Sequence, residues 1–131
     1  VPARLDTLAK SNSDAVRASA LFTRGALAID QRDMPLASRL YGQIVADDSL
    51  PQPYRDAALL RQVAVDFDKI KPDQVIARLA PLAKPGAPFY GSAAEMTAAA
   101  MIKQGKSAEA GKLFAAIAAD KSLPDTLRGR A

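Results

Sequence analysis

The chain has 131 residues, a length that suits one ordinary domain with a core of its own. It contains neither cysteine nor histidine, which excludes disulfides and thiolate sites and removes the commonest general base and metal ligand. Its net charge of +4 comes from 18 basic and 14 acidic residues that are interspersed, so we expect no nucleic-acid partner, which would need clustered lysines and arginines.

Alanine is abundant and runs of strand-forming residues are missing, so the whole chain is predicted to be helical. Capping residues at 11–14 and Pro35 mark helix starts, and the sequence Pro-Gly-Ala-Pro at 85–88 is the strongest break. In chain order, the predicted helices are residues 4–10, 14–31, 35–47, 53–69, 72–84, 88–104 and 107–120, and a last helix that begins after Pro124.

A repeat runs along the chain: residues 37–51 and 110–124 match at an offset of 73. The paired positions include Ala37/Ala110, Leu40/Leu113, Tyr41/Phe114, Ile44/Ile117, Asp47/Asp120, Ser49/Ser122, Leu50/Leu123 and Pro51/Pro124. A degenerate copy around Val75, Leu79 and Leu82 lies between them. Two units of about 34 residues predict an all-α solenoid of stacked antiparallel helix pairs, each pair too small to bury both faces alone.

We therefore expect one helical repeat domain over residues 1–131. Its units are predicted at 13–50, 51–87 and 88–123, with a partial helix at 124–131.

The turn and second helix of the last unit resemble the tetratricopeptide repeat. Residues 105–114 are similar to that family's Gly-x-x-x-x-Ala-x-x-x-aromatic segment, and Asp33, Ala37 and Tyr41 match it in the first unit. Gly25 then falls on the small-residue position where the two helices of a pair touch. The middle unit departs from the pattern, because Val75 stands where alanine is usual.

A narrower resemblance rests on Leu-Pro-x-x-Tyr-Arg-Asp-Ala-Ala-Leu-Leu-Arg at 50–61, Ile-Ala-Arg-Leu-Ala-Pro-Leu at 76–82 and Pro88-Phe89. These phrases are similar to the bacterial family of the ancillary subunit of the SecYEG translocon. The resemblance implies an N-terminal membrane anchor upstream of Val1 and a repeat domain on the periplasmic side of the inner membrane. It also implies protein partners among translocon and chaperone subunits. A cytoplasmic location stays open as the alternative.

No arrangement of residues predicts catalysis, a cofactor or a metal ion, so we expect the chain not to be an enzyme. Carboxylate pairs occur at Asp47-Asp48 and at Asp66 and Asp68. Asp47 and Asp120 occupy the same place in two copies of the repeat, each followed by Ser-Leu-Pro. A position shared in this way is typical of a turn rather than of an acid–base pair.

In a stack of helix pairs the first helices line the concave face. The residues predicted to bind a partner there are Phe22, Ile29, Leu60, Phe67 and Ile102. They would form an apolar groove for a helix or an apolar segment. The alternative is that they pack inside a tightly wound superhelix, and the sequence leaves both readings open.

The function expected from these features is a protein–protein interaction scaffold. Two alternatives remain at this point: a self-assembly module that forms homodimers, and an accessory domain of an enzyme whose catalytic part lies outside residues 1–131.

Overall fold

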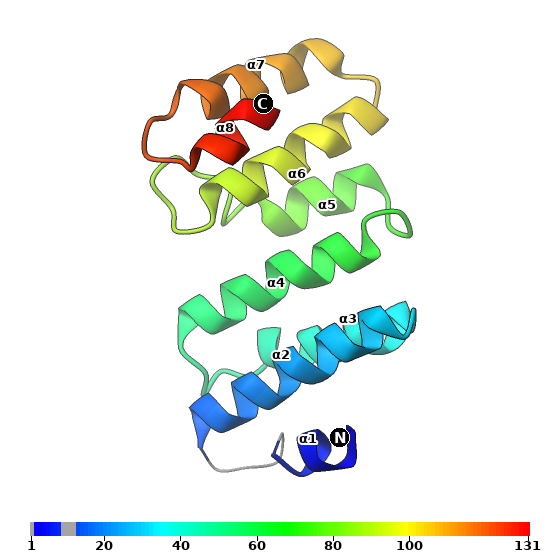
Figure 1. Ribbon diagram of the computed structural model, residues 1–131. Coiled ribbons are helices and arrows are strands. Elements are labelled where there is room, and N and C mark those ends of the chain that lie inside the picture. The colour runs from blue at the N-terminus through cyan, green and yellow to red at the C-terminus, as the bar shows by residue number, and fades with distance from the viewer. Residues whose placement is uncertain (1, 9–12) are drawn as a thin grey trace. The chain divides into compact units, whose positions relative to one another are not determined.

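The structure, a computed structural model, describes residues 2–8 and 13–131. All regular elements in these two ranges are α-helices, which confirms the predicted all-α class (Figure 1). The chain forms two compact halves, residues 1–66 and residues 67–131. The predicted middle unit, 51–87, has its first helix in one half and its second helix in the other. One continuous repeat domain over the chain stays a prediction.

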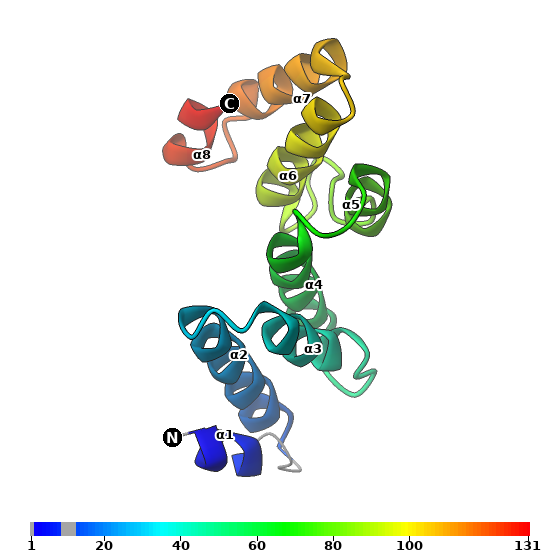
Figure 2. The same ribbon diagram turned by 90° about the vertical axis from the view of Figure 1, so that its right-hand side faces the viewer.

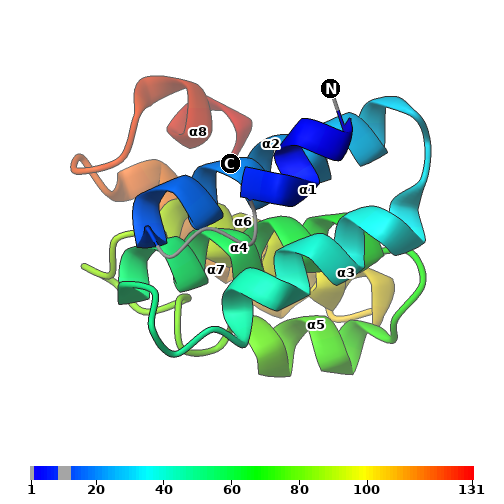
Figure 3. The same cartoon turned by 90° about the horizontal axis from the view of Figure 1, so that it is seen from below.

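The N-terminal half consists of α1 (Pro2–Leu8), α2 (Asp14–Asp30), α3 (Met34–Val45) and α4 (Gln52–Asp66). Each helix packs against the next in chain order, and Figure 3 shows α1 alongside α2. The side chain of Ser13 accepts a hydrogen bond from the Val16 N–H, and that of Asp33 accepts one from the Leu36 N–H. Both satisfy amide groups that a helix start leaves without an internal partner.

The core of this half is built from large residues of α3 set against small residues of its neighbours. Tyr41, Ile44 and Leu50 are among its largest fully buried side chains. The other buried members of the cluster are Ala18, Leu21, Ala28, Ala37, Leu40 and Ala58. The alanines let α2, α3 and α4 approach closely enough for Tyr41 and Ile44 to fill the space between them.

The C-terminal half consists of α5 (Pro72–Leu79), α6 (Tyr90–Lys103), α7 (Ser107–Ala119) and α8 (Asp125–Arg130). Helix α5 packs on α6, α6 on α7 and α7 on α8, as Figure 2 shows. One of its buried clusters joins α6, α7 and α8 through Tyr90, Ala94, Ile117 and Leu127. Leu127 lies over Gly91, where there is no room for a side chain on α6.

Several predicted helix limits were wrong. Helix α5 ends at Leu79 instead of continuing to Lys84, since the ring of Pro81 clashes with the preceding turn and offers no N–H. Helix α4 ends at Asp66 rather than Lys69, and α6 begins at Tyr90 rather than Pro88. Helix α1 begins at Pro2. Its predicted end, Lys10, lies outside the described residues, as do Ser11 and Asn12 of the capping cluster.

The 73-residue offset recurs in the backbone. Helices α3 and α7 begin 73 residues apart, and so do α4 and α8. The turn after α2 is closed by hydrogen bonds from Arg32 N to Ile29 O at 2.9 Å and from Asp33 N to Ala28 O at 2.8 Å. The turn after α6 repeats them, from Gly105 N to Ile102 O and from Lys106 N to Met101 O, both at 2.9 Å. Arg32 and Gly105 both have positive φ, as this way of ending a helix requires.

Replacing Gly25 by alanine should destabilise the chain although alanine is the better helix former. The added Cβ would lie 2.8 Å from Cζ of the buried Tyr41 ring, so the expected loss is about 1–3 kcal/mol in the free energy of unfolding. Gly111→Ala in α7 is the matched control, because nothing lies within 4 Å of its added Cβ. It should gain about 0.5–1 kcal/mol. Urea unfolding followed by circular dichroism measures both. The same change in the two variants, or a stabilised Gly25→Ala variant, would contradict the close contact.

Candidate functional site

Phe22 and Ile29 lie on α2 and are half-buried against the core of the N-terminal half. The Phe22 ring lies 6.1 Å from the Tyr41 ring, tilted by 53°. From α4, Cζ of Arg61 lies 5.3 Å from the centre of the Phe22 ring, within the range of a cation–π contact. Leu60, the residue before Arg61, is also half-buried. Phe22 therefore packs against the core of this half, and Arg61 of α4 contacts its ring.

In the C-terminal half, Phe67 and Ile102 are both neighbours of Lys103. The ammonium nitrogen of Lys103 lies 4.5 Å from the centre of the Phe67 ring and 3.0 Å from a carboxylate oxygen of Asp68. Ile102 precedes Lys103 in α6 and is 52% exposed. It is one of three large hydrophobic side chains in the described ranges that are classed as exposed, with Val16 and Tyr54.

The five predicted binding residues thus lie in two local settings. Phe22, Ile29 and Leu60 belong to the N-terminal half, where Phe22 and Ile29 share one core cluster. Phe67 and Ile102 belong to the C-terminal half, where Lys103 adjoins both. That all five line one groove stays a prediction. Within the N-terminal half, Phe22 and Ile29 are half-buried against the core, so the packed alternative and the groove both stay predictions.

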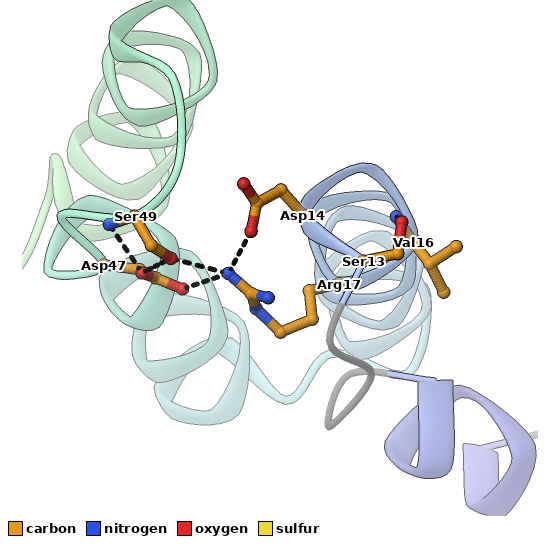
Figure 4. A network of polar contacts seen from close by, with 6 residues as sticks. All are labelled: Ser13, Asp14, Val16, Arg17, Asp47 and Ser49. Carbon is orange, nitrogen blue, oxygen red and sulfur yellow. Dashed lines mark hydrogen bonds and ion pairs between the residues drawn. The ribbon is translucent and has the colours of Figure 1, made fainter.

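A polar network that was not predicted joins the start of α2 to the loop after α3 (Figure 4). The Arg17 guanidinium donates to Asp14 at 2.8 Å, to Asp47 at 3.2 Å and to Ser49 Oγ at 2.7 Å. Arginine recurs at this place in two later helices. Arg55 in α4 reaches Asp48, and Arg128 in α8 donates to the Ala118 carbonyl. Arg55 follows Arg17 by 38 residues and Arg128 follows Arg55 by 73, and both offsets are visible in the sequence.

The loops at Asp47 and Asp120 confirm the predicted turn role. Asp47 accepts hydrogen bonds from the Ser49 N–H at 3.0 Å and from its hydroxyl at 2.5 Å. Asp120 accepts the same pair from Ser122 at 3.0 and 2.6 Å. Hydrogen bonds from the serine hydroxyl contribute most to lowering the pKa of each carboxyl, and the backbone N–H adds to them. Arg17 lowers the pKa of Asp47 further, and Arg128 that of Asp120.

Arg17 responds to the same network in the opposite sense. Burial alone would lower its pKa, but the hydrogen bonds and charges of Asp14 and Asp47 outweigh that effect and raise it. Arg17 is therefore a fixed cation that ties two elements together, and its chemistry is that of a structural clamp.

Among residues 2–8 and 13–131, no group of three or more His, Cys, Asp or Glu side chains is placed to hold a metal ion. No helix in the described part of the chain is both long and apolar enough to cross a bilayer. The expectations that the chain is not an enzyme and has an anchor upstream of Val1 stay predictions.

No protein-family model matches the chain, and no match is found among curated proteins or among solved structures. The resemblances to tetratricopeptide repeats and to the translocon-associated family therefore enter below as proposals.

Acid should destabilise the fold through Asp47 and Asp120. Each pKa is lower in the folded chain than the ordinary value of about 3.9, so each stabilises the fold above that pH and ceases to as pH falls through its folded pKa. Carboxyl NMR titration should show both pKa values rising when the serine is removed. Ser122→Ala should bring Asp120 closer to its ordinary pKa than Ser49→Ala brings Asp47, because Arg17 still bonds to Asp47. Unchanged pKa values in both variants would contradict this account.

Ile29 and Ile102 occupy the same repeat position and form a matched pair for separating packed from exposed residues. Ile29→Ala should cost about 1–2 kcal/mol in the free energy of unfolding, because Ile29 packs on the core cluster. Ile102→Ala should change it by less than about 0.5 kcal/mol, since half of that side chain already faces solvent. Urea unfolding of the two variants decides. A large loss at Ile102 would show that it is a core residue and remove it from the candidate site.

Proposed function

We propose that this chain is a protein–protein interaction scaffold of the tetratricopeptide type, built from stacked antiparallel helix pairs, and that it is not an enzyme. The observation that carries the proposal is the recurrence, 73 residues apart, of the helix starts, of the turn that closes a helix pair and of the Asp-x-Ser-Leu-Pro loop. A unit used more than once with the same hydrogen bonds is typical of solenoids, whose extended surfaces bind other proteins.

The first helix of each pair supplies the apolar residues of this surface. Positions equivalent to Ile29 carry Phe67 and Ile102, so an apolar residue stands there in each of the three proposed units. Its exposure differs between the units, because Ile29 and Phe67 are half-buried whereas Ile102 is 52% exposed. An apolar residue kept at a repeated but solvent-facing position supports a binding role more than a packing role.

We further propose that the partners are translocon or chaperone subunits and that the chain lies on the periplasmic side of the inner membrane. The phrases at 50–61 and 76–82 and Pro88-Phe89 support this placement through their resemblance to the translocon-associated family. Tetratricopeptide folds serve many processes, so this step rests on the resemblance and not on the geometry.

Photo-crosslinking tests the scaffold and its partners together. A photoreactive phenylalanine at position 67 or 102 of the full-length protein, purified from native membranes, should capture translocon or chaperone subunits covalently. The same residue at position 116 is the control, because Ala116 is exposed on α7, a second helix. Capture at 116 alone would remove the proposed surface. Co-purification of soluble cytoplasmic proteins only, with no crosslink at 67, would remove the membrane placement, and a crosslinked homodimer would favour self-assembly.

A further inference from the structure

The turn between α6 and α7 combines an exposed apolar side chain with positive charge. Ile102 is 52% exposed, and Lys103 and Lys106 follow it within the same turn. The segment that begins at Phe67 is held beside this turn, because Lys103 pairs with Asp68 and Gln104 donates a hydrogen bond to Asp73. That segment brings two more exposed lysines, Lys69 and Lys71. We call Phe67, Lys69, Lys71, Ile102 and Lys106 the turn patch.

Lys103, which adjoins the turn patch, is neutralised by Asp68. Lys69, Lys71 and Lys106 form no ion pair with any residue in the described ranges. These three lysines outnumber the nearby Asp73 carboxylate, whose partner Gln104 is neutral, so the local field is positive and favours an acidic partner.

The equivalent turn of the N-terminal half shows that the fold does not require these residue types. The turns after α2 and α6 have the same two closing hydrogen bonds, and each has a residue with positive φ at the same position. Yet Asp30 and Asp33 stand where the second turn has Lys103 and Lys106. The same backbone is therefore compatible with either sign of charge, so the turn geometry does not account for Lys103 and Lys106.

Lys106 does not make the capping hydrogen bond that Asp33, its counterpart in the first turn, makes. The Asp33 carboxylate accepts a hydrogen bond from the Leu36 N–H at 3.2 Å and so caps α3. Lys106 stands at the same position before α7 and makes no side-chain capping hydrogen bond. Lysine cannot accept one, whereas aspartate is among the best capping residues. A residue that gives up helix stability at an exposed position is typical of a binding surface.

We propose that the turn patch binds a short acidic segment of a protein partner, with an apolar side chain packed on Ile102 and carboxylates beside Lys69, Lys71 and Lys106. This rests on the proposed scaffold function and names the chemistry of one partner. A protein segment fits better than a lipid surface. Basic surfaces that recognise anionic lipids gather about 4–8 lysines or arginines, whereas the turn patch has three and lies beside Asp68 and Asp73.

Selection from a display library of random short peptides tests the proposal on the isolated chain. Peptides retained by the wild-type chain should be enriched in aspartate and glutamate next to a leucine, isoleucine or phenylalanine. Their affinity, measured by fluorescence anisotropy, should fall steeply with salt, as contacts between charges on exposed side chains do.

The decisive variant is Lys106→Asp. It should raise Tm by about 3 °C because it restores the missing cap, and it should weaken binding of the selected peptides about tenfold because it reverses a charge. A variant that is more stable yet binds less well cannot owe the loss to misfolding. Ile102→Ser should weaken binding by a similar factor, and Lys112→Glu on α7 is the control for net charge and should leave binding unchanged.

Three outcomes would overturn the proposal. These are selected peptides without carboxylates, peptide binding that Lys106→Asp and Ile102→Ser leave intact, and binding to phosphatidylglycerol vesicles that displaces the peptides and is lost in the same variants. The last result would assign the turn patch to a membrane. Partner capture by a photo-crosslinker at Phe67, combined with any of these results, would reject the acidic ligand and leave the scaffold function standing.

Discussion

The closure of a helix pair over a small residue is the constraint on which the N-terminal half depends. A turn of three residues returns the chain from α2 into α3, so the two helices lie against each other along their length. The Tyr41 ring can then lie on α2 only where that helix has no side chain, which is at Gly25. The Phe22 ring contacts the same ring at a tilt of 53°, and the guanidinium of Arg61 on α4 lies over Phe22. Three helices are thus joined through two aromatic side chains, Tyr41 and Phe22.

The C-terminal half meets the same requirement with different residues. Ala98 stands at the position of Gly25 and Phe114 at that of Tyr41. Phe114 is only partly buried and packs against the cluster, whose buried members include Tyr90 and Leu127. In this half the glycine that permits close approach is Gly91 of α6, which lies under Leu127 of α8. The ends of α2 and α6 and the starts of α3 and α7 therefore stay equivalent while the contacts change, since packing depends on total volume more than on the identity of each side chain.

The sequence supported the helical class, the starts of helices such as α2, α5 and α7 and the close approach at Gly25, because each depends on local or repeated chemistry. Serine and aspartate before α2 and α3, proline in a first turn and the Asp-x-Ser-Leu-Pro loop act over a few residues and need no knowledge of neighbours. The end of α5 differs from the predicted one because Pro81 interrupts an otherwise helical pattern of apolar residues. The exposure of Ile102 and the half-burial of Ile29 could not be predicted, because equal residues at equal repeat positions differ only in what packs against them. Arg17 could be seen in the sequence as a repeated arginine. Its role as a link between two elements depends on Asp47 and Ser49, which only the structure places beside it.

The two helix turns separate what the fold demands from what it tolerates. Each turn requires a residue with positive φ and an N–H that donates back to the preceding helix. Arg32 and Gly105 have the positive φ, and the N–H groups of Asp33 and Lys106 donate back. Neither demands a particular charge, since aspartates occupy one turn and lysines the other. The Asp33 carboxylate stabilises the helix that follows it, whereas Lys106 leaves that stabilisation unused and keeps its charge free of ion pairs with the described residues. When the same backbone carries a stabilising residue in one copy and an uncompensated cation beside an exposed isoleucine in the other, the difference is best explained by what the second copy contacts.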